Sequence, residues 1–294
     1  MGRYFLGSAD PTLLAMPPLH ILWRDEHIVA VYKPAGWLVH RTGLDAGETR
    51  FVMQTLRDQL GQHVFPVHRL DKGTCGVLVM ALHAPAARAL SQAFEQHRLH
   101  KRYLAMVRGW APESVAVDHA LRPDDAPPDA AVQQAFTGFR RLAQLTLHEA
   151  SDAQFASTRA SLVEATPTTG RRHQIRRHLK HLAHPIIGDA THGKGPLNRW
   201  WAARLGQQRL WLHAWQLQLA HPITGEWLVL DSGLPQNLLA ALTPPPSNRN
   251  TTVSAGAAAC ADWRHLLGDW PWTLAAGDEI ALASGPPAPT PVAP

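Results

Sequence analysis

One acid stands out among the residues that could do chemistry: Asp71, within residues 68–76 (HRLDKGTCG). The apolar run over 77–82 predicts a buried strand, so Asp71 lies in the loop that enters this strand. An acid at such a place can be a turn residue that accepts backbone N–H groups. It can also be a carboxylate held at the rim of a sheet as a nucleophile or general base. For an isolated acid the turn role is the commoner one, so the loop alone does not assign chemistry to Asp71.

A second candidate lies on an alternating segment, residues 101–109 (KRYLAMVRG). The alternation places Tyr103 and Val107 on one face and Leu104 and Met106 on the other, which predicts a strand. A lone tyrosine on a half-buried strand is usually a core residue. The segment becomes informative only in combination with the other motifs.

The most cationic stretch covers residues 170–184 (GRRHQIRRHLKHLAH) and predicts a helix that Pro185 ends. Between Glu164 and Glu226 the only acid is Asp189, against nine Lys or Arg residues. A run of charge is usually a solvated helix face, but one this long without acids indicates a surface for phosphates. The cations expected to contact a polyanion here are Arg171, Arg172, Arg177 and Lys180.

The histidines of this stretch allow a second interpretation, a metal-dependent hydrolase. His178 and His181 are three residues apart and share one face of the predicted helix. No cysteine or acid stands near them at ligand spacing, and the HExxH motif is absent. We therefore predict no metal site.

Together these segments resemble the motifs of the RluA-type RNA pseudouridine synthases. The family's HRLDxxTxG matches residues 68–76, with Cys75 where Ser is usual, and its KxYxAxVxG matches 101–109. Its GRxHQIRxHL matches 170–179. The resemblance spans about residues 20–240. It implies an α+β pseudouridine synthase fold, in which helices flank a mixed, mainly antiparallel sheet around a central RNA-binding cleft.

The resemblance also implies a role for each matching residue. Asp71 would be the catalytic carboxylate, with Arg176 as its partner. Tyr103 would lie beside the target base, and Leu212 would form the apolar floor under it. Arg69 would fill the space that the base leaves or bind a phosphate. The implied reaction, isomerisation of uridine to pseudouridine, is redox-neutral and needs no cofactor.

Within the family the chain resembles the branch that modifies tRNA at uridine 65, in the T stem near the acceptor stem. Residues 57–65 (RDQLGQHVF) and 188–193 (GDATHG) carry this finer likeness. It implies tRNA as the partner. Two alternatives stay open: a synthase of the same family that acts on rRNA or on another tRNA site, and an RNA-binding module without chemistry.

The elements that must position these residues follow from periodicity and turn signals. Residues 112–131, rich in Pro, Asp and Ala, are expected to form an irregular exposed connection. Lys33, in the turn KPAG, is expected to be a solvated cation. Helices are predicted at 50–62 and 85–97, and strands at 28–32, 136–147, 157–166 and 227–230. Residues 209–214, with Leu217 and Leu219, resemble the last core strand of the family.

Composition agrees with a packed domain and a polyanionic partner. The 294 residues are 45% hydrophobic and 17% charged, with a net charge of +5. Cys75 and Cys260 cannot build a disulfide framework, so a reducing cytoplasm is the expected location. No apolar stretch approaches the length of a membrane span. We expect a monomer.

Four segments are predicted along the chain. Residues 1–18 form a flexible lead, 19–242 the catalytic domain, and 243–261 a linker. Residues 262–294 form a tail, with a short Trp-rich helical segment packed on the main body and a disordered end.

Overall fold

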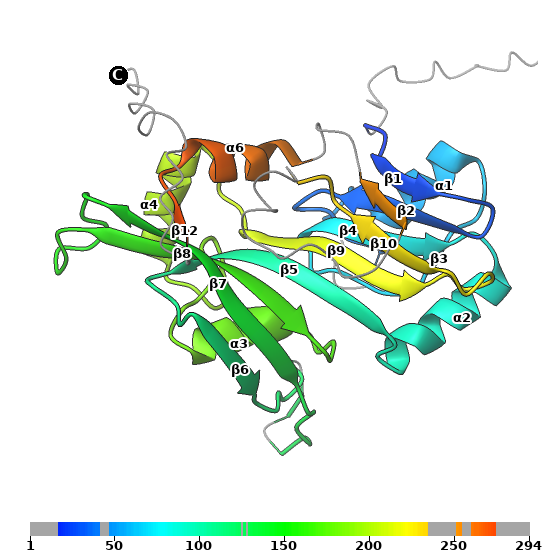
Figure 1. Ribbon diagram of the computed structural model, residues 1–294, viewed down its shortest axis with the longest axis horizontal. Helices are drawn as coiled ribbons and strands as arrows, with labels where there is room; N and C mark the ends of the chain where they lie inside the picture. The colour runs from blue at the N-terminus through cyan, green and yellow to red at the C-terminus, as the bar shows by residue number, and fades with distance from the viewer. Residues whose placement is uncertain are drawn as a thin grey trace, which may run out of the picture.

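The computed structural model describes residues 17–41, 47–124, 126–127, 129–234, 251–254 and 260–274 (Figure 1). Most of the predicted lead, most of the predicted linker and the predicted disordered end of the tail lie outside these ranges. No helix within them is long and apolar enough to cross a membrane.

Twelve strands of the described chain form one mixed sheet (Figure 1). Its main order is β1-β2-β4-β9-β5-β8-β7-β12, while β10 joins β9 to β11, β3 lies beside β4, and β6 lies beside β7. Neighbours are antiparallel except β4 with β9 and β10 with β11. The predicted mixed, mainly antiparallel sheet is confirmed. The strands are β1 Ile21–Arg24, β2 Ile28–Lys33, β3 Phe65–Pro66, β4 Cys75–Ala81, β5 Leu99–Arg108, β6 Ser114–Asp118, β7 Phe136–Leu147, β8 Thr158–Pro167, β9 Leu212–Ala220, β10 Trp227–Asp231, β11 Thr251–Ser254 and β12 Thr273–Leu274.

The helices begin and end at residues that suit helix termini. The second helix has Pro85 in its first turn, and the side chain of His83 accepts the backbone N–H of Ala86 at 3.3 Å. The first and fourth helices end at Gly61 and Gly206, both in the left-handed conformation. The helices of the described chain are α1 Val52–Leu60, α2 Ala84–Glu95, α3 Gln174–His181, α4 Gly195–Leu205 and α6 Ala261–Asp269.

Strands β2 and β4 are buried on both faces, as their continuous apolar sequences require. Ile28 and Ala30 belong to the larger hydrophobic core, whereas Val29 and Val31 face a second, smaller core. Helix α1 covers the smaller core with residues such as Leu56. The loop that carries Asp71 thus leads into a strand held from two sides.

The segment predicted to be irregular, residues 112–131, contains strand β6, so that prediction is wrong in part. Strand β6 pairs with β7 over its whole length, and a bridge between Leu121 and Gln133 continues the pairing. The short alternation SVAVD is a weak strand signal, whereas the prolines and aspartates after it are a strong signal of irregular structure. Helix α4 was also not predicted.

The close approach of β4 to β9 explains a glycine of the first motif. The two strands pair in parallel at only two positions, Cys75 with His213 and Gly76 with Ala214. Gly76 has φ +115°, and a Cβ there would lie 2.1 Å from the carbonyl oxygen of Ala214. Only glycine allows this contact, which brings the Asp71 loop beside the start of β9.

Candidate active site

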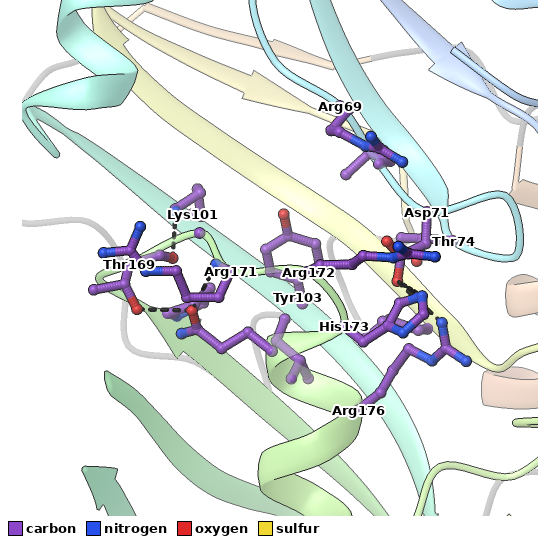
Figure 2. Close-up of a pocket in the computed structure, with 16 residues that line it drawn as sticks. Arg69, Asp71, Thr74, Lys101, Tyr103, Thr169, Arg171, Arg172, His173 and Arg176 are labelled. Carbon is purple, nitrogen blue, oxygen red and sulfur yellow. Dashed lines mark hydrogen bonds and ion pairs between the residues drawn. The ribbon is translucent and has the colours of Figure 1, made fainter. Parts of the chain in front are cut away.

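A cleft of about 180 Å³ opens beside this junction (Figure 2). Four parts of the chain line it: the loop before β4, strand β5, the loop between β8 and α3 with the start of α3, and the start of β9. The four predicted catalytic residues meet there, together with three of the predicted RNA-binding cations. These residues are Asp71, Tyr103, Arg176 and Leu212, with Arg69, Arg171 and Arg172.

Asp71 and Arg176 form an ion pair across 105 residues of sequence. Nη1 of Arg176 lies 3.2 Å from Oδ2 of Asp71, and Nε2 of His173 lies 3.9 Å from the same oxygen. The Asp71 side chain keeps 22% of its surface exposed, against 9% for Arg176. The carboxylate is therefore paired with a cation and still accessible from the cleft.

A second acid, Asp189, holds the other side of Arg176. Its two carboxylate oxygens accept from Nε and Nη2 of Arg176, both at 2.8 Å, and one of them also accepts the N–H groups of Thr191 and His192 at 2.9 Å. Burial is the largest single influence and would raise the pKa of this fully buried carboxyl, but Arg176 and the N–H groups of His192 and Thr191 together lower the pKa. Asp189 therefore fixes the orientation of the guanidinium that faces Asp71.

The pKa of Arg176 is raised, although burial alone would lower it, because Asp189 and Asp71 favour the charged guanidinium. Sequence reasoning assigned no role to Asp189. A signal was present, because Asp189 is the only acid between Glu164 and Glu226 and stands among nine cations.

Lys33 anchors the loop that carries Asp71. Its side chain is fully buried, so the prediction of a solvated turn cation is wrong. Its Nζ donates to the carbonyl oxygens of Pro34 (3.1 Å), Lys72 (3.1 Å) and Thr74 (2.7 Å), two of which belong to the Asp71 loop. Burial lowers the pKa of Lys33 to about 7. The Lys-Pro turn and the first motif are thus one connected unit.

Tyr103 and Leu212 supply the less polar part of the cleft. Tyr103 lies on β5 next to an irregularity in the pairing of β5 with β9, which falls between Arg102 and Tyr103. Burial, with the negative charge of Asp71 as a smaller cause, raises the pKa of Tyr103. The phenol is therefore neutral at physiological pH. Leu212 is buried at the start of β9, next to the parallel junction.

The predicted RNA-binding cations differ in their position relative to the cleft and in their partners. Arg69 lines the cleft with an exposed side chain, and Nε of Arg171 donates to the carbonyl oxygen of Gln134 at 3.0 Å. Lys180 is exposed on α3 but does not line the cleft. Arg172 and Arg177 form ion pairs with Asp124, a residue that sequence reasoning did not single out.

The histidines of α3 have structural partners. His178 is fully buried, with Nδ1 3.0 Å from Oγ1 of Thr137 and Nε2 3.0 Å from the carbonyl oxygen of His119. Over the ranges that the structure covers, no three His, Cys, Asp or Glu side chains are grouped so that they could hold a metal ion. Independence from metals and other cofactors stays a prediction.

The model of the RNA pseudouridylate synthase family matches residues 27–181, which include the Asp71 loop, Tyr103 and Arg176. This chain belongs to the RNA pseudouridine synthase family, whose reaction is an isomerisation. The predicted family and enzyme class are confirmed.

Relatives and solved structures agree with this assignment. The chain is 49% identical over 232 residues to a Salmonella typhimurium protein named tRNA pseudouridine synthase C, covering 76% of this chain and 89% of that protein. A Yersinia pestis protein of the same name is 52% identical over 219 residues, with coverage of 72% and 85%. The structure of human RNA pseudouridylate synthase domain containing 1 matches with a TM-score of 0.58 and 26% identity, over 76% of this chain and 86% of that one. The predicted pseudouridine synthase fold is confirmed.

Proposed function

We propose that this protein isomerises a uridine of tRNA to pseudouridine and that Asp71 is the catalytic carboxylate. One observation carries the proposal: Asp71 is accessible in a cleft and paired with Arg176, which the buried Asp189 holds in place. The names of the Salmonella typhimurium and Yersinia pestis relatives support tRNA as the substrate. The sequence resemblance supports uridine 65 as the target.

The reaction breaks the bond between N1 of uracil and C1′ of the ribose, rotates the uracil and joins C5 to C1′. The proton on C5 is then lost and N1 gains one, so the atoms balance without an oxidant or reductant. The ionised Asp71 either attacks C1′ or takes a proton from C2′, and each role needs the charged carboxylate. Arg176 pairs with this carboxylate at 3.2 Å and orients it.

A uridine in a stem must leave the helix before it can reach Asp71, at a cost of a few kcal/mol. Tyr103 offers the flipped base a flat neutral ring, and Leu212 an apolar floor. Arg69, on the exposed side of the cleft, is placed to fill the vacated position or to hold a phosphate. Because the major groove of A-form RNA is narrow, recognition rests on shape, 2′-OH groups and phosphates.

The test is single-turnover pseudouridine formation on tRNA, paired with a binding assay. Asp71→Asn keeps the side-chain volume and removes the charge, so the rate should fall by several orders of magnitude. Binding should survive, because the cationic surface provides most of the affinity. Asp58→Asn, which alters an exposed acid on α1, is the matched control and should leave both quantities unchanged.

Three outcomes separate the open alternatives. A near-parental rate in Asp71→Asn would refute the mechanism, and loss of folding would give Asp71 the role of a turn residue. Tight RNA binding by the parent without any product would favour a binding module. Mapping of pseudouridine in cells that lack the protein would show whether the target is tRNA uridine 65, another tRNA site or rRNA. A monomeric state and a cytoplasmic location stay predictions.

A further inference from the structure

Asp124 occupies the centre of a cationic cluster at the start of α3. Its Oδ1 lies 3.2 Å from Nη1 of Arg177, and its Oδ2 lies 3.5 Å from Nε of Arg172. Nδ1 of His173 is 2.8 Å from the same Oδ2. One carboxylate thus neutralises side chains that the sequence analysis expected to face a polyanion.

The cluster is continuous with the proposed active site. His173 stands between the two acids, because its Nε2 lies 3.9 Å from Asp71 and its Nδ1 faces Asp124. Arg172 and His173 lie on the Asp71 side of the cleft in Figure 2. Any anion that replaced the Asp124 carboxylate would therefore lie next to the position of the reacting nucleoside.

The segment that carries Asp124 is held at its base and meets α3 near its tip. At the base, Leu121 and Gln133 exchange two backbone hydrogen bonds of 2.8 and 2.9 Å. Nearer the tip, Nη1 of Arg177 donates to the carbonyl oxygen of Arg122 at 2.6 Å, beside its contact with Asp124. A change at the tip would leave the pairing of β6 with β7 intact.

We propose that Arg172 and Arg177 bind a backbone phosphate of the RNA next to the target uridine, and that Asp124 holds this site in the free protein until the phosphate displaces it. The inference rests on the proposed function, because it takes RNA as the ligand. Guanidinium groups bind carboxylate and phosphate through the same geometry, so the carboxylate is a stand-in for the phosphate.

The partial exposure of the cluster lowers the free-energy cost of replacing the Asp124 carboxylate by a phosphate. The Asp124 side chain is 24% exposed and that of Arg172 46%, and ion pairs this close to solvent contribute little to stability. A phosphate carries its charge on several oxygens and can contact both guanidinium groups at once. The internal pairs therefore lower the affinity for RNA by a modest factor, which a phosphate can overcome.

Affinity for tRNA, measured as a function of salt, tests this inference. Asp124→Asn should bind about fivefold tighter than the parent, because two ion pairs no longer compete with the phosphate. Asp118→Asn is the matched control: it removes an exposed acid from β6, and Asp118 makes no ion pair within the described ranges. Arg172→Ala and Arg177→Ala should each lower the salt slope by about one counterion.

A combined variant separates displacement from a general effect of charge. In the background Arg172→Ala with Arg177→Ala, Asp124→Asn should tighten binding no more than Asp118→Asn does. If Asp124→Asn gave the same fivefold gain in tRNA affinity in that background, the proposal of a phosphate site would be refuted. Inorganic phosphate can also be tested as a competitor of labelled tRNA. If it displaces the labelled tRNA as well as unlabelled tRNA does at the same concentration of phosphate groups, the cluster binds a free anion and the proposed RNA phosphate site is refuted.

Pseudouridine formation by the parent on the same tRNA keeps the two proposals apart. If product forms and Asp124→Asn binds no tighter than Asp118→Asn, the phosphate site is wrong and the proposed function stands. If Asp124→Asn binds tighter as expected but the parent forms no product, the phosphate site stands and the proposed function fails.

Discussion

Two carboxylates share the guanidinium of Arg176, and they do so unequally. Asp189 is fully buried and makes two hydrogen bonds of 2.8 Å to it, whereas Asp71 makes one of 3.2 Å and stays partly exposed. Asp71 therefore keeps an oxygen available for chemistry. The pair of Arg176 with Asp189 is buried, and the pair of Arg176 with Asp71 faces the cleft.

Asp189→Asn should lower both stability and turnover. The change removes the charge that compensates the buried side of Arg176, and breaking such a pair costs about 3–5 kcal/mol of unfolding free energy. In urea titrations the unfolding midpoint of the variant should therefore lie at a lower urea concentration than that of the parent. At a temperature where the variant is folded, kcat should fall more than the affinity for tRNA, because the guanidinium would turn away from Asp71.

A purely structural role for Asp189 would give a different result: the destabilised but folded fraction would turn over at the parental rate. Glu26→Gln changes an exposed acid that pairs with the neighbouring His27, far from Arg176 in the sequence, so it is the control. It should leave kcat and the urea midpoint where they are in the parent.

At this scale the sequence predicted the residues that belong to motifs and not the residues that act through burial. The roles of Asp71, Tyr103 and Arg176 are predictions that rest on neighbouring residues matching a family pattern. The fully buried state of Lys33 and the pairing of Asp124 depend on contacts between segments far apart in the chain. Neither is visible in local composition, since a Lys-Pro turn and a Pro-Asp-rich segment both indicate exposure.

At the scale of elements, the loop before β4 is fixed at both ends. Lys33 binds its C-terminal end, and the side chain of His68 attaches its N-terminal end to Val79 of β4. Nε2 of His68 accepts the backbone N–H of Val79 at 3.0 Å, and its ring stacks on Phe94 with centroids 4.3 Å apart. Acceptance of an N–H requires the unprotonated nitrogen, and burial correspondingly lowers the pKa of His68 to about 3.

The stability of the protein should therefore depend on pH through His68. The ordinary pKa is 6.5, so between pH 3 and 6.5 the unfolded chain binds a proton that the folded protein excludes. His68 thus stabilises the fold above pH 6.5, and this contribution is lost as the pH falls towards 3. Relative to His68→Gln, the unfolding free energy of the parent should decrease on acidification by at most about 1.4 kcal/mol per pH unit.

Gln does not titrate, and its amide oxygen can still accept the N–H of Val79, so the comparison isolates the proton. Chemical unfolding at a series of pH values measures the difference between the two proteins. A difference that stays constant from pH 3 to 7 would show that His68 is protonated as readily in the folded protein as in the unfolded chain.

The elements themselves were predicted where periodicity was strong. Strands β2, β5, β7 and β8 and helices α1 to α3 lie within a few residues of their predicted bounds. Helix α4 was missed because its sequence, GPLNRWWAARL, has tryptophans next to each other and no clear apolar face. The order of the strands could not be read from the sequence, because pairs such as β4 with β9 join residues more than 130 positions apart.

At the scale of the whole molecule, residues 260–274 pack on the centre of the sheet although the sequence resemblance ends near residue 240. Helix α6 lies along the upper side of the view in Figure 1, and α3 lies across the strands from it. Fully buried Trp263 contacts the rings of Trp211 and His213, with centroids 5.4 and 5.3 Å apart. Arg209 joins α6 to the first motif, because it contacts Asp262 at 2.6 Å and Sγ of Cys75 at 2.8 Å.

Trp263→Ala should therefore destabilise the catalytic domain itself. Removing a buried aromatic side chain costs about 3–5 kcal/mol, and this one covers the residues that flank the parallel junction of β4 and β9. Trp110→Ala removes a tryptophan that is 43% exposed and should cost far less. A single cooperative urea transition, shifted for Trp263→Ala and monitored by fluorescence and by activity, is the expected result. If activity kept its parental midpoint while fluorescence shifted, α6 would unfold by itself, and the tail would not be part of the unit that holds Asp71 in place.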